Sequence, residues 1–182
     1  QSDASFRKYF RVYIKNNKKK LLLVNSPKEI ENNLGYLKVT NIFEKMNLSV
    51  PKIFNFDSSS GSFLIEDFGL NTYTNSLKNG ISEYKLYNLA TDILIYINNH
   101  SKNLEKKLPK YSNKKFIDEV LLFLKWYWPA IYKEKPKKNI ENEFIIIWKN
   151  LLNRNLKTKK VLVHRDFHID NLFFLKDRPM TR

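Results

Sequence analysis

The sequence predicts an α+β protein in which an antiparallel β lobe with a helix precedes a mainly helical lobe. Residues 5–24 and 52–68 each alternate apolar and polar side chains around a polar turn, which is the pattern of a β-hairpin. Later in the chain, apolar residues recur at helical spacing in three stretches, at 86–97, 116–124 and 144–152. The first part therefore predicts a small antiparallel sheet, and the second part predicts amphipathic helices.

The change from strand to helix patterns falls close to Gly69. We therefore expect a boundary near residues 69–72, with residues 1–69 as a β lobe and residues 70–182 as a helical lobe.

A helix is expected between the two hairpins. Pro27 breaks the strand before it, and Glu29 and Glu31 would lie in the first turn of a helix that begins near Lys28, where the helix dipole favours acids. A further helical stretch covers about 34–47.

Two boundaries in the second part of the chain also follow from the pattern. Pro129 is expected to close the helix that contains residues 116–124. The apolar runs 161–163 and 172–175 predict two short strands on either side of a polar loop.

Composition excludes several classes of protein. Hydrophobic residues make up 42% of the chain and aromatic residues 14%, which is too much for a disordered protein. No apolar run is long enough to span a membrane, and the absence of cysteine excludes disulfides, thiolate metal sites and a cysteine nucleophile. Because no signal-peptide pattern opens the chain, we expect a cytoplasmic protein, and we take a monomer as the default.

The net charge of +15 is compatible with an anionic partner such as nucleic acid, a membrane or phosphate. The runs rich in lysine and asparagine at 16–20, 135–139 and 157–160 all fall where loops are expected, rather than on one helical face with interleaved aromatic residues. This placement favours solvated loops over a nucleic-acid surface.

The strongest chemical motif is the stretch from His164 to Asn171. It reads His-Arg-Asp, then four residues, then Asn, which is the spacing of the catalytic loop of protein kinases. In that loop the aspartate accepts the proton of the attacking hydroxyl and the asparagine binds a magnesium ion. The motif therefore predicts phosphoryl transfer with ATP and Mg²⁺, with Asp166 as the catalytic base and Asn171 as the metal ligand.

A metal-dependent hydrolase is the rival interpretation of the same stretch. His164, Asp166, His168 and Asp170 alternate, so on an extended strand they would face one side, as ligands of zinc or iron do. His100 is the one further histidine in the sequence, so the additional ligands of such a site are missing. We favour a buried His164 that hydrogen-bonds backbone around the loop, and leave His168 and Asp170 open.

The motif resembles that of the aminoglycoside phosphotransferase and choline kinase superfamily, relatives of protein kinases with a bilobed fold. The segments 3–11, 25–27, 64–69 and 119–127 are further similar to the bacterial cell-wall amino-sugar kinases. These phosphorylate the anomeric hydroxyl of N-acetylmuramate or N-acetylglucosamine with ATP.

The resemblance implies an ATP-dependent phosphotransferase for a small-molecule hydroxyl in cell-wall recycling. Two alternatives stay open: another small-molecule kinase, of the aminoglycoside or choline type, and a degenerate kinase-like binding module.

The resemblance also implies that residues 1–69 form a nucleotide-binding β lobe and that the helical lobe, residues 70–182, carries the catalytic loop. Ser5 and Phe6 lie in a turn that resembles the loop over the phosphates, and Glu66 and Phe68 lie where the hinge of the family meets adenine through backbone groups. An ordinary hairpin turn and a domain linker are the simpler interpretations of these two segments.

The expected third strand lacks the lysine with which kinases hold the α- and β-phosphates. Arg7 or Arg11 is our hypothesis for the substituting cation, because a guanidinium binds phosphate bidentately. Glu29 or Glu31 is the candidate partner of that cation, although a solvated acid in the first helical turn is the favoured interpretation.

Kinases of this class also use a second metal-binding acid after the catalytic loop. Asp177 lies in an expected turn and too early for this role. We therefore expect a C-terminally truncated chain, and expect residues 1–182 on their own to bind nucleotide poorly and to transfer no phosphate.

The acceptor site is less defined. Trp126, Tyr127 and Trp128 form an aromatic cluster, in which Trp126 is a candidate for stacking against a sugar ring, although packing in the core is favoured. Tyr111 and Glu119 are further candidates. The excess of 33 basic over 18 acidic residues favours a neutral or anionic acceptor, such as an N-acetylated sugar, over a polycationic aminoglycoside.

Overall fold

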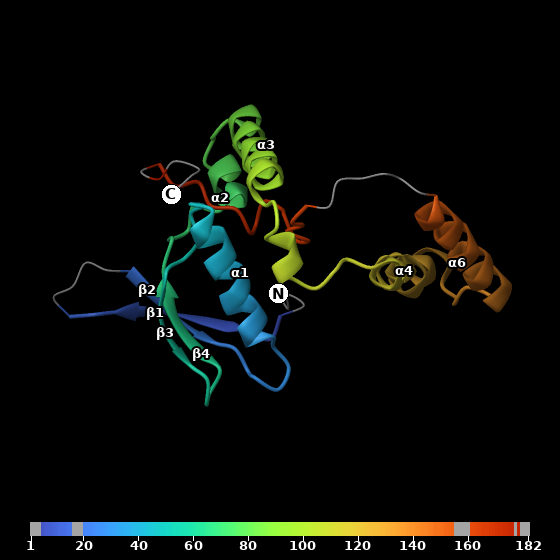
Figure 1. Cartoon of the computed structure of the whole chain (residues 1–182), viewed down its shortest axis with the longest axis horizontal. Coiled ribbons are helices and arrows are strands. Elements are labelled where there is room, and N and C mark those ends of the chain that lie inside the picture. Colours follow the sequence, from blue (N-terminus) through green and yellow to red (C-terminus); the bar gives the residue numbers. More distant parts are fainter. Residues whose placement is uncertain (1–4, 16–19, 155–160, 177, 179–182) are drawn as a thin grey trace. The chain divides into compact units, whose positions relative to one another are not determined.

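The computed structural model describes residues 5–15, 20–154, 161–176 and 178. The chain forms two compact units: the first contains residues 1–102 and 162–182, and the second contains residues 103–161. Figure 1 shows the elements of each unit, and we describe each unit by itself. The expected lobe boundary near residues 69–72 lies inside the first unit and stays a prediction.

A four-stranded antiparallel sheet forms the N-terminal part of the first unit (Figure 1). Its strands are β1 (Lys8–Tyr13), β2 (Lys20–Asn25), β3 (Ile53–Asp57) and β4 (Ser62–Glu66), in the spatial order β1-β2-β4-β3. Both predicted hairpins are confirmed, although the tip of the first, residues 16–19, lies outside the described residues. The sheet buries Val24, Phe63 and Ile65 on one face, where alternation places them.

Helix α1 (Asn33–Lys45) packs against this core through Tyr36 and Leu37. The expectation of a helix from Lys28 is wrong, because residues 28–31 form turns and bends. The helix begins at the next asparagine pair, where the Asn32 side chain accepts a hydrogen bond from the backbone N–H of Gly35 at 2.9 Å.

Two further helices, α2 (Tyr73–Lys78) and α3 (Glu83–His100), follow in the first unit. Each begins with a side-chain cap, from Thr72 and Ser82 respectively. Their buried residues Tyr73, Leu86 and Ala90 form a second core. None of the helices in the described part of the chain has the length and apolar character that a membrane-spanning segment needs.

The expectation of two short strands on either side of the polar loop, at 161–163 and 172–175, is wrong. Over the described residues 161–176, the only β pairing is an isolated bridge between Thr72 and Phe173. The apolar side chains that suggested strands are used for packing instead: Leu172 and Phe174, together with Phe167 and Ile169, pack against the core of α2 and α3.

The second unit is helical in its described residues. It contains η1 (Glu105–Lys107), α4 (Asn113–Leu122), a π-helical segment η2 (Phe123–Tyr127), α5 (Trp128–Tyr132) and α6 (Lys138–Asn153). Contrary to expectation, Pro129 does not close the helix: it lies in the first turn of α5, where its missing N–H is tolerated. The helix ends at Lys133, in the left-handed conformation with φ 59°.

The aromatic residues of this unit are only partly packed. Phe123 stacks on Phe144 with ring centroids 6.0 Å apart, which joins η2 to α6. Trp126, favoured as a core residue, is 66% exposed, and so the core interpretation of Trp126 is wrong within this unit. Lys125 Nζ lies 5.2 Å from the Trp126 ring centroid.

Candidate active site

The loop from His164 to Asn171 brings the predicted base and the predicted metal ligand together. The side-chain nitrogen of Asn171 donates to Asp166 Oδ2 at 2.7 Å and to the Asp166 carbonyl oxygen at 3.0 Å. Both residues are exposed, so the carboxylate and the carboxamide are accessible to a ligand. Arg165 precedes Asp166 with φ 71°, a conformation that a non-glycine residue rarely adopts and that is typical of functional loops.

His168 and Asp170 surround this pair. His168 Nε2 lies 3.4 Å from Asp166 Oδ1, and His168 Nδ1 lies 3.8 Å from Asp170 Oδ2. The Thr74 hydroxyl donates a hydrogen bond to Asp170, which links the loop to α2. Within the described residues, no three histidine or acidic side chains are placed to share one metal ion, so the rival hydrolase site gains no support.

His164 attaches the start of the loop to the hydrophobic part of the unit. Its ring stacks on Phe43 of α1, with centroids 5.7 Å apart and planes at 10°, and meets the edge of Phe167 at 5.4 Å. Burial lowers the pKa of His164 below its ordinary value, although the charge and backbone of Asp166 act in the opposite direction. The packing of the His164 ring between Phe43 and Phe167 supports a structural role for this residue.

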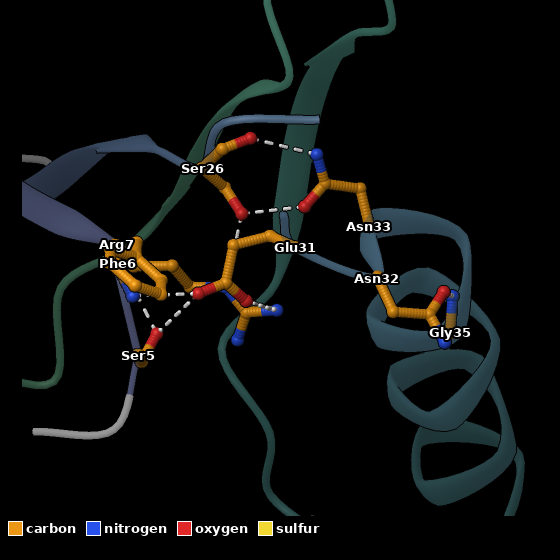
Figure 2. A network of polar contacts seen from close by, with 8 residues as sticks. All are labelled: Ser5, Phe6, Arg7, Ser26, Glu31, Asn32, Asn33 and Gly35. Atoms are coloured by element: carbon orange, nitrogen blue, oxygen red, sulfur yellow. Dashed lines mark hydrogen bonds and ion pairs between the residues drawn. The ribbon is translucent and has the colours of Figure 1, made fainter. Parts of the chain in front are cut away.

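Three of the predicted nucleotide-binding residues meet on one carboxylate, that of Glu31 (Figure 2). Glu31 Oε1 accepts hydrogen bonds from the Ser5 hydroxyl at 2.9 Å and from the backbone N–H of Phe6 at 2.8 Å. The Arg7 guanidinium lies 3.2 Å from Glu31 Oε2. Glu31 is therefore the acidic partner of Arg7, and its expected role as a solvated acid at a helix start is wrong.

Arg7 also contacts a buried polar pair, Ser26 and Asn33 (Figure 2). Arg7 Nε donates to the Ser26 hydroxyl at 3.1 Å, the hydroxyl donates to Asn33 Oδ1 at 2.5 Å, and Asn33 Nδ2 donates to the Ser26 carbonyl oxygen at 2.8 Å. Arg7 also lies over the Tyr36 ring, 4.9 Å from its centroid. Sequence reasoning did not identify Ser26 and Asn33 as site residues, although the segment 25–27 carried part of the resemblance.

Arg11, the second candidate cation, is held at a different place. Its Nε donates to Asp67 Oδ2 at 2.6 Å, and its terminal nitrogen donates to the Gly69 carbonyl oxygen at 3.2 Å. Burial acts to raise the pKa of Asp67, but hydrogen bonds from Arg11 and the Gly69 N–H, with the charges of Arg11 and Lys20, outweigh it and hold that pKa below its ordinary value. Arg11 thus joins β1 to the segment that follows β4.

The expected hinge residues lie at the end of β4. Glu66 forms an ion pair with Arg178, and its backbone N–H donates to the Lys52 carbonyl oxygen at 2.9 Å. The Phe68 ring meets the edge of Phe173 at 5.7 Å, and Arg178 lies 5.1 Å from its centroid. These contacts tie the end of the sheet to the chain that follows the catalytic motif.

A four-stranded antiparallel sheet with a packed helix, combined with a His-Arg-Asp loop and its asparagine, defines a kinase-like protein. The chain belongs to the phosphotransferase enzyme family, whose family model matches residues 1–181. This confirms the resemblance and the predicted α+β fold class.

Two relatives among curated proteins carry the name of an amino-sugar kinase. The chain is 29% identical over 182 residues to an N-acetylmuramate/N-acetylglucosamine kinase of Pseudomonas aeruginosa, covering 98% of this chain and 51% of that protein. It is 28% identical over 185 residues to a protein of the same name from Neisseria meningitidis, covering 98% of this chain and 53% of the relative. The chain thus spans about half the length of these relatives.

Proposed function

We propose that the whole protein transfers the γ-phosphoryl group of ATP to a hydroxyl of an N-acetylated amino sugar, most specifically the anomeric hydroxyl. The observation that carries the proposal is the Asp166–Asn171 pair, a carboxylate and a carboxamide 2.7 Å apart on an exposed loop. The names of the relatives support the choice of acceptor. An ATP-dependent enzyme of cell-wall recycling would act in the cytoplasm, where ATP is available.

Asp166 has the position and chemistry of a base. Its carboxylate would accept the proton of the sugar hydroxyl while the new oxygen–phosphorus bond forms and the bond to ADP breaks. The hydrogen bond from Asn171 holds Asp166 Oδ2 in place, and Oδ1, which lies 3.4 Å from His168 Nε2, is the oxygen that would accept the proton.

The donor set at this loop fits magnesium. Because the Asn171 nitrogen donates to Asp166, its amide oxygen remains as a ligand atom, and oxygen ligands are those that Mg²⁺ prefers. When bound, the ion would neutralise charge on the phosphates. Within this chain, Asn171 would be the residue that holds it.

The nucleotide would contact the other two groups of predicted residues. Ser5, Phe6 and Arg7 would bind phosphate oxygens, and backbone groups around Glu66 and Phe68 would meet the adenine ring. Arg11 would act through Asp67 and Gly69 as a brace between the sheet and this hinge.

The test is an ADP-release assay on the full-length protein with N-acetylmuramate, N-acetylglucosamine, choline and an aminoglycoside. We expect turnover with an N-acetylated sugar, and ³¹P NMR should assign the product as a sugar 1-phosphate. Asp166→Asn should lower kcat about 100-fold or more, because it removes the base. Asp92→Asn, which removes an exposed charge on α3, should leave kcat unchanged. Turnover with choline alone, or full activity in Asp166→Asn, would refute the proposal.

A further inference from the structure

The Glu31 carboxylate occupies a place that is built for an anion. A hydroxyl, a backbone N–H and a guanidinium converge on it from three consecutive residues, Ser5, Phe6 and Arg7 (Figure 2). The Glu31 side chain is only 12% exposed, so this carboxylate fills the centre of the donor group rather than its edge.

The same donors suit a phosphate group. Phosphate oxygens accept charge-assisted hydrogen bonds from arginine, and they accept further bonds from hydroxyl groups and from backbone N–H groups in turns. A carboxylate satisfies these donors with two oxygens, whereas a phosphate would offer three. A polyphosphate is therefore a chemically equivalent occupant with more acceptors and more charge.

Arg7 does not depend on Glu31 for its position. Its Nε is bound to Ser26, which is fixed by the buried Asn33, and its guanidinium rests on the Tyr36 ring. Ser26 and Tyr36 therefore hold Arg7 in place, while its terminal nitrogen forms the ion pair with Glu31.

Glu31, in contrast, lies outside the regular structure. It belongs to the turn that precedes α1, and its backbone N–H donates to the Pro27 carbonyl oxygen at 2.9 Å. Asn32, not Glu31, caps the helix. The side chain can therefore leave the donors without breaking a helical hydrogen bond.

We propose that Glu31 is an exchangeable internal occupant of a polyphosphate site formed by Ser5, Phe6 and Arg7, and that the nucleotide binds by displacing its carboxylate. The identification of the polyphosphate with ATP rests on the proposed function. Since ligand and carboxylate compete for the same donors, the carboxylate lowers the apparent affinity for the ligand.

The experiment measures binding of Mg-ATP and of tripolyphosphate to the full-length protein by calorimetry. Glu31→Gln keeps the shape and an acceptor oxygen but removes the charge, so it should bind both ligands about five- to tenfold more tightly, as expected for loss of a charge-assisted competitor. Glu29→Gln makes the same change of net charge two residues away on an exposed side chain, and should bind like the wild type.

Equal or weaker binding by Glu31→Gln would overturn the proposal, because it would make Glu31 a fixed support of Arg7. An equal gain in Glu29→Gln would also overturn it, since the effect would then be general electrostatics. If Glu31→Gln does not fold, Glu31→Asp replaces it, with a smaller gain expected. Failure of both variants to fold would show that Glu31 is a fixed structural residue and would overturn the proposal. If no variant binds Mg-ATP while Glu31→Gln binds tripolyphosphate more tightly, the proposed function fails. The proposal that a polyphosphate displaces the Glu31 carboxylate is then supported on its own.

Discussion

The Asp67 carboxylate is expected to make the stability of the protein depend on pH. Its buried carboxylate is held ionised by Arg11 and by the Gly69 N–H at 2.7 Å. Asp67→Asn keeps the size of the side chain but removes the charge that Arg11 binds. We expect it to lower the melting temperature of the full-length protein at pH 7 by about 3 °C or more, as follows from loss of a charge-assisted hydrogen bond.

The sign of the pH dependence follows from the lowered pKa of Asp67. A carboxyl group whose pKa is lower in the folded state stabilises that state above its unfolded pKa, and this contribution is lost as the pH falls through the folded pKa. The difference in melting temperature between wild type and Asp67→Asn should therefore be constant from neutral pH down to about pH 4 and shrink below it. A difference that stays constant down to pH 2 would contradict the assignment.

Individual residues were predictable from the sequence where a motif fixes their spacing. Asp166 and Asn171 were expected to act together, and the structure places them in direct contact. Ser26 and Asn33 were not expected, because a serine beside a proline and an asparagine near a helix start resemble ordinary caps. Their burial and their link to Arg7 arise from tertiary packing, which no local pattern encodes.

The turn of the β3–β4 hairpin packs closely against the Ser26–Asn33 pair that holds Arg7. Gly61 in its turn has φ +75°, and a Cβ there would lie 2.2 Å from the Ser26 carbonyl oxygen and 2.8 Å from Asn33 Nδ2. Gly80 has φ +79°, but open space around it. These two glycines therefore separate the cost of backbone conformation from the cost of the close approach.

Gly61→Ala should destabilise the full-length protein by about 3 kcal/mol or more, whereas Gly80→Ala should cost about 1 kcal/mol, the price of the left-handed conformation alone. Urea unfolding of the two variants measures the difference. Because the added methyl group presses on the Ser26–Asn33 pair, Gly61→Ala should also weaken Mg-ATP binding, and Gly80→Ala should not. Equal destabilisation by both substitutions would show that the turn does not constrain the pair.

Elements were predicted well where periodicity extends over many residues. Both hairpins and the helices of the second part follow the apolar pattern, because burial of one face imposes it. The errors fall where a local signal competes with tertiary contacts. Glu31 lies in the turn before α1 and pairs with Arg7. Leu172 and Phe174 pack against the core of α2 and α3, and Phe173 meets Phe68, instead of forming a strand.

At the scale of the whole molecule, the fold class follows from the succession of β and α patterns, which is why α+β was correct. The strong positive charge carries less information. Of the three lysine-rich runs, 157–160 lies wholly outside the described residues and 16–20 lies outside them except for Lys20. In the third run, Lys138 pairs with Glu141 at 3.0 Å at the start of α6. The charge is therefore a weaker guide to function than the few residues of the catalytic loop.

A ligand that binds the folded protein must stabilise the whole of it, and this gives a test that does not depend on turnover. At about 100 times its dissociation constant, Mg-ATP should stabilise the full-length protein by about 2.7 kcal/mol, seen as a higher melting temperature. Asn171→Ala removes the proposed magnesium ligand, so the extra stabilisation that Mg²⁺ adds to ATP should shrink, while Asn55→Ala, an exposed asparagine of β3, should keep it. If Mg²⁺ added the same stabilisation in Asn171→Ala as in the wild type, Asn171 would not hold the metal, and the chemistry assigned to its partner Asp166 would lose its main support.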